Sequence, residues 1–291
     1  MSIEIHHLAA ISGDLQKTID FYHNVLGLKC IRKATLFDGP KVCHFYWGKS
    51  IENFITFYHC PGLYKTVGNF NASGTISFLV NKEARQYWSK RLCGYGIRFV
   101  PKEDELERCD TLNLRDPDGL AIKLIFSSQV SRSTNHDDSF FNYAIKGIYG
   151  IEIASTKLGS LSNLFVDKFK MNVEQRSINR YRFFGATRQG SVIDLDSGIA
   201  HMDSKAGYGR IHHIALKIHN WQHFLDLRDD FGYENQHTIF KKHPNNYSAM
   251  YFWNDGDLLF EIVGQRTSAF KASFLNLMQH IPDIPRKSQV R

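Results

Sequence analysis

The sequence of 291 residues predicts an α+β protein in which four βαβββ modules pair into two domains with curved, mixed but mostly antiparallel sheets. Three observations lead to this prediction. One order of segments, a strand, a helix and three strands, occurs at both ends of the chain, and two weaker copies lie between them. The first and last copies open with the related segments IHHLA and IHHIA. Asp-Gly turns, which tolerate a positive φ, separate the last two strands of the second and fourth copies.

The first module begins with a strand at residues 3–11 and continues with a helix whose apolar residues recur at helical spacing between residues 15 and 26. Asp14 precedes this helix as an N-cap, and Gly27 suits its C-terminal end. Three strands are then predicted, at residues 28–35, 42–48 and 53–60.

The other modules repeat this order. The fourth module has a helix at residues 221–233 that ends at Gly232. Its strands are predicted at residues 211–218, 237–243, 247–254 and 257–264. Helices at residues 83–97 and 157–171 mark the second and third modules. Their strands are predicted at residues 75–81, 98–102, 110–116, 120–127, 148–156, 173–177, 180–186 and 190–197.

A polar stretch at residues 127–139 separates the second and third modules and is typical of a linker. We therefore expect an N-terminal domain at residues 1–128, formed by modules one and two, and a C-terminal domain at residues 140–268, formed by modules three and four. Residues 269–291 are expected to form a C-terminal tail.

Composition narrows the class of protein. Hydrophobic residues make up 43% of the chain and charged residues 22%, which is ordinary for a globular protein. No apolar run approaches the roughly 20 residues needed to cross a bilayer, and the N-terminus has no signal-peptide pattern. We therefore expect a cytoplasmic protein without a membrane partner. The sequence leaves open whether it forms a homo-oligomer.

The net charge of +7 raises the question of nucleic-acid binding. The basic residues are scattered among acidic ones, as at residues 102–108, and only residues 285–291 are locally basic. Nucleic acid is therefore not an expected partner. The five cysteines are odd in number and form no CxxC pair, so free thiols are expected: Cys30, Cys43, Cys60, Cys93 and Cys109.

The repeated His-His dipeptide is the most specific chemical signal in the sequence. Because neighbouring side chains in a strand point to opposite faces, each pair is expected to send one imidazole to the concave face of its sheet and one to the other face. Two histidines that open equivalent modules favour metal ligation over the ordinary role of a hydrogen-bonded core histidine. Alternation alone does not choose between His6 and His7, or between His212 and His213.

A carboxylate partner is expected on a strand beside the same cleft. Glu261 lies in the apolar segment LLFEIVG, where an ionised carboxylate is unfavourable unless it is paired or bound to a metal. The alternative is a salt bridge to a lysine or arginine. Two imidazoles and one carboxylate form the facial triad of non-haem iron(II) oxygenases, with coordination positions left open. The sequence thus predicts one divalent metal ion per chain, iron(II) first, with manganese, zinc, nickel or cobalt as alternatives.

The segments 5–28, 116–125 and 254–263 resemble the vicinal oxygen chelate superfamily, which includes glyoxalases, fosfomycin-resistance proteins and extradiol ring-cleaving dioxygenases. The resemblance spans residues 3–265. Within the superfamily, the chain is most similar to two-domain ring-cleaving dioxygenases of the hydroquinone-dioxygenase type. That resemblance implies that His7, His213 and Glu261 are the metal ligands.

The same resemblance implies that Tyr251 lies near a substrate oxygen, although a packed strand aromatic is the alternative. Further catalytic candidates are His6, His212 and, on a loop, His243. One departure concerns an arginine that such relatives carry in the loop before the Tyr251 strand, because Pro244 stands near its expected position. Proline offers neither charge nor a hydrogen-bond donor, so substrate positioning must differ.

The closing strands of the other modules lack a corresponding glutamate. Module two has Lys123, module one has Thr56 or Phe57, and the opening strand of module three has no histidine. A second metal centre of the same kind is therefore not expected, and the cleft between modules two and three is expected to serve packing.

The predicted function is an extradiol-type dioxygenase that uses dioxygen to open a hydroquinone- or catechol-like ring. The first alternative is a glyoxalase-like lyase or thiol transferase that uses a metal as a Lewis acid. Many such enzymes have two glutamate ligands, which disfavours this alternative. The second alternative is a protein that binds a small aromatic compound without converting it.

Overall fold

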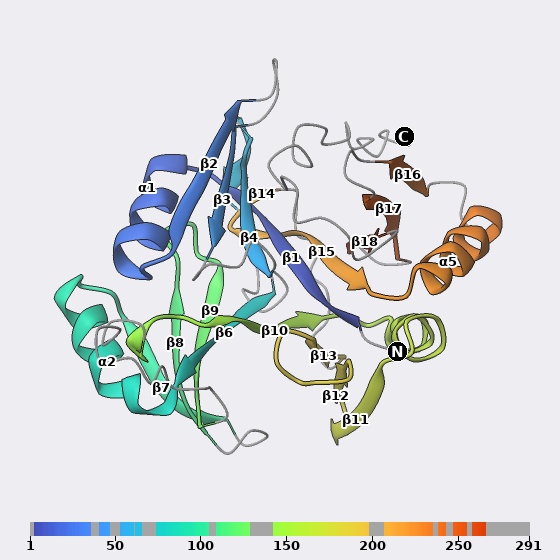
Figure 1. The fold of residues 1–291 in the computed structure, drawn as a ribbon. Helices are drawn as coiled ribbons and strands as arrows, with labels where there is room; N and C mark the ends of the chain where they lie inside the picture. The colour runs from blue at the N-terminus through green and yellow to red at the C-terminus, as the bar shows by residue number, and fades with distance from the viewer. Residues whose placement is uncertain are drawn as a thin grey trace.

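A computed structural model of the chain describes residues 3–35, 41–46, 53–60, 62–65, 74–104, 109–128, 142–197, 207–234, 238–242, 247–254 and 258–265. Two eight-stranded mixed sheets dominate the fold, and helices lie on their outer faces (Figure 1). The predicted α+β class is confirmed. His243, Pro244 and the tail at residues 269–291 lie outside the described residues, as does most of the predicted linker.

All four modules show the predicted order of elements. Module one contains β1 (Ile3–Ser12), α1 (Leu15–Ile19) with the π-helical segment η1 (Asp20–Val25), β2 (Lys29–Thr35), β3 (Lys41–Tyr46) and β4 (Phe54–His59). Module two contains β6 (Thr75–Asn81), η3 (Lys82–Ala84), α2 (Arg85–Gly94), β7 (Phe99–Asp104), β8 (Cys109–Arg115) and β9 (Ala121–Ser127). Module three contains β10 (Gly147–Ala154), α4 (Leu158–Ser162), η5 (Asn163–Lys168), β11 (Asn172–Ser177), β12 (Arg180–Phe184) and β13 (Val192–Asp196). Module four contains β15 (Arg210–Ile218), α5 (Trp221–Glu234), β16 (Ile239–Lys242), β17 (Tyr247–Trp253) and β18 (Leu259–Gln265).

Local signals explain the helix ends, with one exception. The Asp14 side chain accepts hydrogen bonds from the backbone of Gln16 and Lys17, and Gly27 has a φ of 73°. In contrast, α5 runs through Gly232 to Glu234. The strands β5 (Tyr64–Lys65) and β14 (Gly207–Tyr208), which form a parallel ribbon, were not predicted because two residues show no alternation.

The pairing of modules differs from the prediction. The first sheet has the order β16-β17-β18-β15-β1-β4-β3-β2, so it joins module four to module one. The second has the order β11-β12-β13-β10-β6-β9-β8-β7 and joins module three to module two. Consecutive modules therefore do not share a sheet within either predicted domain. Either arrangement pairs the edge strand of one module with that of another, so alternation within strands could not choose between them. The boundaries 1–128 and 140–268 stay a prediction.

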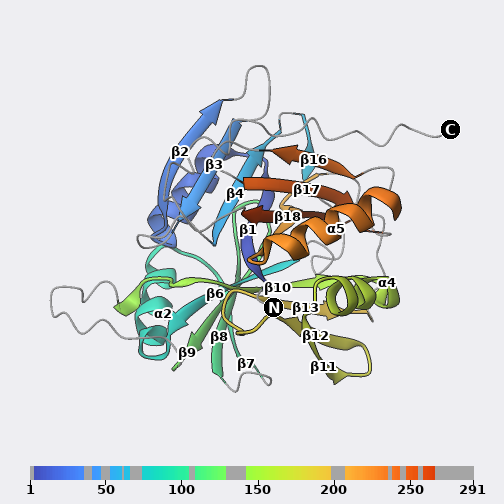
Figure 2. The same cartoon turned by 45° about the vertical axis from the view of Figure 1, so that its right-hand side comes forward.

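Strand alternation separates the core from the concave face of the first sheet. On β4, Phe57 packs against Tyr22 of the first helix and Phe45 of β3, with ring centroids 4.5 and 5.8 Å away. Elsewhere along the same sheet, α5 packs against β15 and β18 (Figure 2). Gly264 permits this contact, because a Cβ there would lie 2.5 Å from the Phe224 ring. The helices thus cover one face of the sheet. Thr56 and the residues two positions away on β4, Phe54 and Tyr58, lie on the other face.

The turn at residues 116–119 connects module two to module one. Its Asp118 carboxylate accepts a hydrogen bond of 3.0 Å from the Gly13 backbone, and the Tyr22 hydroxyl donates one of 3.2 Å to Asp116. Burial, together with the Asp118 carboxylate, raises the pKa of Asp116 to about 7. No helix within the described part of the chain is long and apolar enough to span a bilayer.

Candidate metal centre

Three residues predicted as metal ligands meet on the concave face of the first sheet. Nε2 of His7 lies 3.0 Å from Nε2 of His213, and Oε2 of Glu261 lies 3.4 and 3.2 Å from these two nitrogens. The three residues are 5%, 4% and 4% exposed, respectively. They form a cluster able to hold a metal ion, with ligand atoms within 4.8 Å of one another.

The register of three adjacent strands brings the ligands together. β1 and β15 run antiparallel at the centre of the sheet, with His7 opposite Ala215 and Ala9 opposite His213. This arrangement is a local two-fold relation, in which each histidine lies diagonally across from the other. Glu261 on β18 pairs with Ala215, so its side chain shares the face of the two histidines.

Two β-bulges correct the expected orientation of the histidine pairs. Between Ile5 and His7 the register advances by two residues on β1 but by one on β15, which makes His6 the extra residue. His212 is the corresponding extra residue on β15. A bulge interrupts alternation and redirects side chains. Hence His6 and His212 do not point away from the site; their Nδ1 atoms lie 2.9 and 2.8 Å from Nδ1 of His7 and His213.

These contacts fit imidazoles that bind a metal through Nε2. If Nε2 of a ligand histidine presents its lone pair, its Nδ1 carries the proton and donates it to the neighbouring outer histidine. Burial is the main cause that lowers the pKa of His7 well below its usual value and that of His6 to about 3. Burial also lowers the pKa of His212. These imidazoles are therefore neutral, as metal ligation requires.

Glu261 supplies the negative charge of the centre. Burial raises the pKa of its carboxyl, but the imidazoles of His7 and His213 and a hydrogen bond from the Tyr251 hydroxyl outweigh burial and lower it to about 2. Tyr251 on β17 stands directly opposite Glu261 in the strand register. Tyr251 therefore lies beside the cluster, and its direct partner is the Glu261 carboxylate. A contact with a substrate oxygen stays a prediction.

The spacing of the three ligand atoms matches a single small cation. Two ligand atoms about 2.1 Å from one ion lie about 3.0 Å apart at a right angle and about 3.4 Å apart at the tetrahedral angle. The observed separations are 3.0, 3.2 and 3.4 Å. Two imidazole nitrogens and one carboxylate thus have the spacing for a divalent ion with open positions.

The two-fold relation decides between Thr56 and Phe57, which the sequence left open, and identifies His44, which the sequence did not single out. Thr56 pairs with Ala9 as Glu261 pairs with Ala215, so Thr56, and not Phe57, is the counterpart of the carboxylate ligand. Likewise His44, opposite Thr56 on β3, is the counterpart of Tyr251. Nδ1 of His44 lies 2.8 Å from the Thr56 hydroxyl, and His44 contributes to the lowered pKa of His7. Only the strand register could reveal these positions.

Aromatic side chains of β4 complete the described surroundings of the centre. The Phe54 ring stacks on His7 with centroids 4.8 Å apart and an interplanar angle of 7°. The Tyr58 ring lies 5.1 Å from that of His212 and 6.2 Å from that of His213. Phe54, Thr56 and Tyr58 alternate along β4 and therefore share one face.

The corresponding face of the second sheet has other residues at the positions of the candidate ligands. By the same register argument, Thr75 and Gly150 stand where the first sheet has His7 and His213. A Cβ at Gly150 would lie 2.5 Å from the backbone oxygen of Val192, so no side chain fits there. Lys123 and Asp194 occupy the closing-strand positions.

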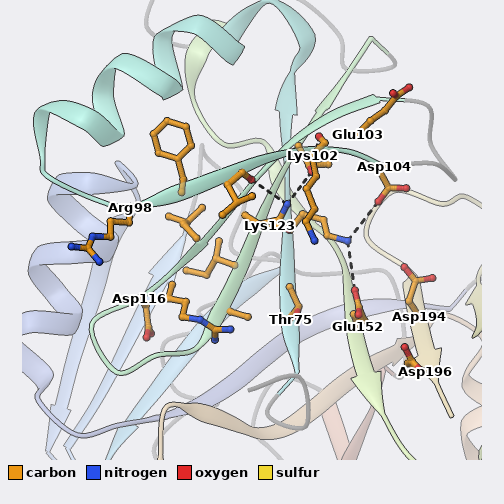
Figure 3. Close-up of a pocket in the computed structure, with 18 of the residues that line it drawn as sticks. Thr75, Arg98, Lys102, Glu103, Asp104, Asp116, Lys123, Glu152, Asp194 and Asp196 are labelled. Atoms are coloured by element: carbon orange, nitrogen blue, oxygen red, sulfur yellow. Dashed lines mark hydrogen bonds and ion pairs between the residues drawn. The ribbon is translucent and has the colours of Figure 1, made fainter. Parts of the chain in front are cut away.

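Contrary to the expectation of a packed interface, this face lines a cleft of about 1270 Å³ with charged walls (Figure 3). Lys123 lies between Asp104 and Glu152, with its Nζ 3.5 Å from each carboxylate. Arg182 binds Asp194 through two hydrogen bonds of 2.6 and 2.7 Å. The Lys123 ammonium group and the Arg182 guanidinium are thus paired with these three carboxylates.

Comparisons with known proteins agree with the fold. Residues 4–124 match the family described as the Glyoxalase/Bleomycin resistance protein/Dioxygenase superfamily. A solved structure described as a putative dioxygenase from Bacillus subtilis covers 91% of this chain and 86% of its own, with a TM-score of 0.73 and 24% identity. Glyoxalase I from Zea mays covers 90% and 92% with a TM-score of 0.64 and 13% identity. These comparisons confirm the predicted resemblance, and the chain has the fold of this superfamily.

Two curated relatives from Bacillus subtilis (strain 168) carry more specific names. "Putative ring-cleaving dioxygenase MhqO" is 28% identical over 264 residues, which cover 89% of this chain and 83% of the relative. "Putative ring-cleaving dioxygenase MhqE" is 26% identical over 268 residues, which cover 89% and 86%. The chain is therefore similar along most of its length to proteins named as ring-cleaving dioxygenases.

Proposed function

We propose that this protein is a metal-dependent, extradiol-type ring-cleaving dioxygenase that acts on a hydroquinone- or catechol-like aromatic compound. The convergence of His7, His213 and Glu261 carries the proposal, because these ligands suit non-haem iron(II) and leave coordination positions open. Bound iron(II) would supply adjacent positions for the substrate oxygen and dioxygen. The names of the relatives MhqO and MhqE support this reaction class.

Residues around the centre would hold the metal-binding side chains in position and accept a proton from the substrate. His6 and His212 would fix the tautomers of His7 and His213 through their Nδ1 atoms. Tyr251 would hold the carboxylate of Glu261 by its hydroxyl. His44, on the same face, is the group best placed to accept a proton from a substrate hydroxyl.

A glyoxalase-like lyase or thiol transferase is the second candidate, and the likeness to maize glyoxalase I in fold is the observation that keeps it. Thr56 weighs against it, because a hydroxyl bound to His44 stands where a second carboxylate ligand would be needed. A protein that only binds an aromatic compound is the third candidate. The buried, paired ligand set disfavours it, since such a set is unfavourable to retain without a metal.

Metal analysis after anaerobic purification tests the proposal. We expect near-stoichiometric iron in the native protein, its loss in a His213→Ala variant, and its retention in a His219→Ala variant, whose imidazole pairs with Glu4 on the surface. Oxygen uptake with hydroquinones and catechols should then accompany ring opening. Bound zinc or nickel without oxygen uptake would favour the lyase, and a failure to bind metal after reconstitution would favour the binding protein. Cell fractionation tests the cytoplasmic location that belongs to this proposal.

A further inference from the structure

The two halves of the metal centre differ on the side of β4. The two-fold relation supplies matching imidazoles from β1 and β15, but only β18 supplies a carboxylate, from Glu261. On β4 the counterpart is Thr56, whose hydroxyl contacts His44. A threonine side chain is too short to replace a glutamate as a ligand, so the β4 side is where a bound ion would keep an open position.

Tyr58 stands beside this open side. It lies two residues beyond Thr56 on β4 and so shares its face, and its ring packs against both His212 and His213. Its ring is buried, and its hydroxyl is close enough to Glu261 and Tyr251 for their charges to interact. Its phenol hydroxyl carries one proton that it can donate in a hydrogen bond.

The other tyrosine of the centre is already engaged. The single proton of the Tyr251 hydroxyl is donated to the Glu261 carboxylate. Among the described residues, the Tyr58 hydroxyl makes no hydrogen bond. Of the two phenols, Tyr58 therefore has the donor that is available to a ligand.

We propose that Tyr58 is a substrate-positioning residue, which donates a hydrogen bond to the oxygen of a phenolic ligand bound on the β4 side of the His7–His213–Glu261 centre. This inference rests on the proposed function and assigns the substrate contact to Tyr58, whereas Tyr251 acts through the ligand Glu261. A hydrogen bond to a deprotonated phenolic oxygen contributes enough to change binding about tenfold or more.

Anaerobic calorimetry with catechol on the iron-loaded protein tests the assignment, with metal affinity measured separately on each variant. Tyr58→Phe keeps the ring packing and removes only the hydroxyl. We expect this variant to bind catechol at least about tenfold more weakly and to bind iron as the native protein does. For Tyr251→Phe, in contrast, we expect the larger change in iron affinity, which should be weaker than in the native protein. Tyr64→Phe, at a side chain that is 86% exposed, is the matched control and should change neither value.

The outcomes separate this inference from the proposed function. Native protein that binds iron but neither catechol nor hydroquinone would overturn both. Native protein that binds catechol, with Tyr58→Phe binding it within twofold, would overturn the Tyr58 assignment and leave the proposed function intact. A loss of iron from Tyr58→Phe equal to that from Tyr251→Phe would also overturn the assignment, because Tyr58 would then support the ligands and not the substrate.

Discussion

Replacement of His212 by alanine tests whether the outer histidine of each pair holds its neighbour as a metal ligand. Nδ1 of His212 lies 2.8 Å from Nδ1 of His213, and both imidazoles are largely buried. In the alanine variant, the Nδ1–H of His213 loses its acceptor, and the ring loses the contact that fixes its tautomer. The His213 side chain itself remains in place, so the variant lowers the metal affinity of the centre without removing an atom that would bind the metal.

Loss of one such outer contact lowers metal affinity about 10–100-fold, or about 1.4–2.7 kcal/mol. His6→Ala should have a similar effect, because its Nδ1 lies 2.9 Å from that of His7. The two contacts belong to one network, because Nε2 of His7 and Nε2 of His213 lie 3.0 Å apart. The losses are therefore expected to be coupled, and the double variant measures that coupling. His213→Ala should lose more than His212→Ala, since it removes a ligand.

Competition with a chromophoric chelator under anaerobic conditions measures these affinities. His219→Ala provides the control, because it removes an imidazole that pairs with Glu4 at the surface. Affinity of His212→Ala within twofold of the native value would refute the reasoning about tautomers. If His6→Ala abolished metal binding while His7→Ala did not, the assignment of ligands within the pair would be wrong.

Three further predictions concern the carboxylate ligand, the proton acceptor and a buried acid. Glu261→Gln should lower metal affinity by at least about 100-fold with an unchanged circular dichroism spectrum, because the amide lacks the charge of the ligand; unchanged affinity would exclude Glu261. His44→Leu should lower kcat about 100-fold at unchanged metal content, since it removes a candidate base; an equal loss of metal would instead indicate a supporting role. The raised pKa of Asp116, about 7, means that the native protein binds more protons than the unfolded chain between about pH 4 and pH 7. Its free energy of unfolding should therefore fall as pH rises through that window, by on the order of 4 kcal/mol, and urea titrations of Asp116→Asn should show a flatter profile. If the free energy of unfolding of Asp116→Asn fell with pH as steeply as that of the native protein, a raised pKa of Asp116 would be refuted.

Local patterns in the sequence predicted the elements, but not the partner of each module. The Asp14 cap, the helical spacing after it and the alternation in segments such as 211–218 act within a few residues, so they are visible in the chain. The joining of β1 to β15 depends on contacts between residues about 200 positions apart. Each module offers the same kind of edge, and the choice is made by packing in three dimensions.

The rarity of a charged residue in an apolar strand and of a duplicated histidine pair pointed to Glu261 and the two pairs, and the family resemblance then selected His7 and His213 as the candidate ligands. The bulges at His6 and His212 could not be predicted, since they appear only when two strands with different residue counts are aligned. The same holds for His44 and Tyr58, which look like ordinary strand residues in the sequence. Their relevance follows from their register relative to His7 and Glu261.

The two sheets differ at the positions that could hold a metal. Both have an antiparallel pair at the centre, but β1 with β15 has two bulges and β6 with β10 has one. In the second sheet the backbone approaches so closely at Gly150 that an imidazole there is sterically excluded, and Lys123 supplies a fixed positive charge. In the first sheet the asymmetry is finer: β18 carries Glu261, and Thr56 stands at the counterpart position on β4. Three protein ligands would leave room on a bound ion that a fourth would fill, and the position of Thr56 would place that room on the side of β4.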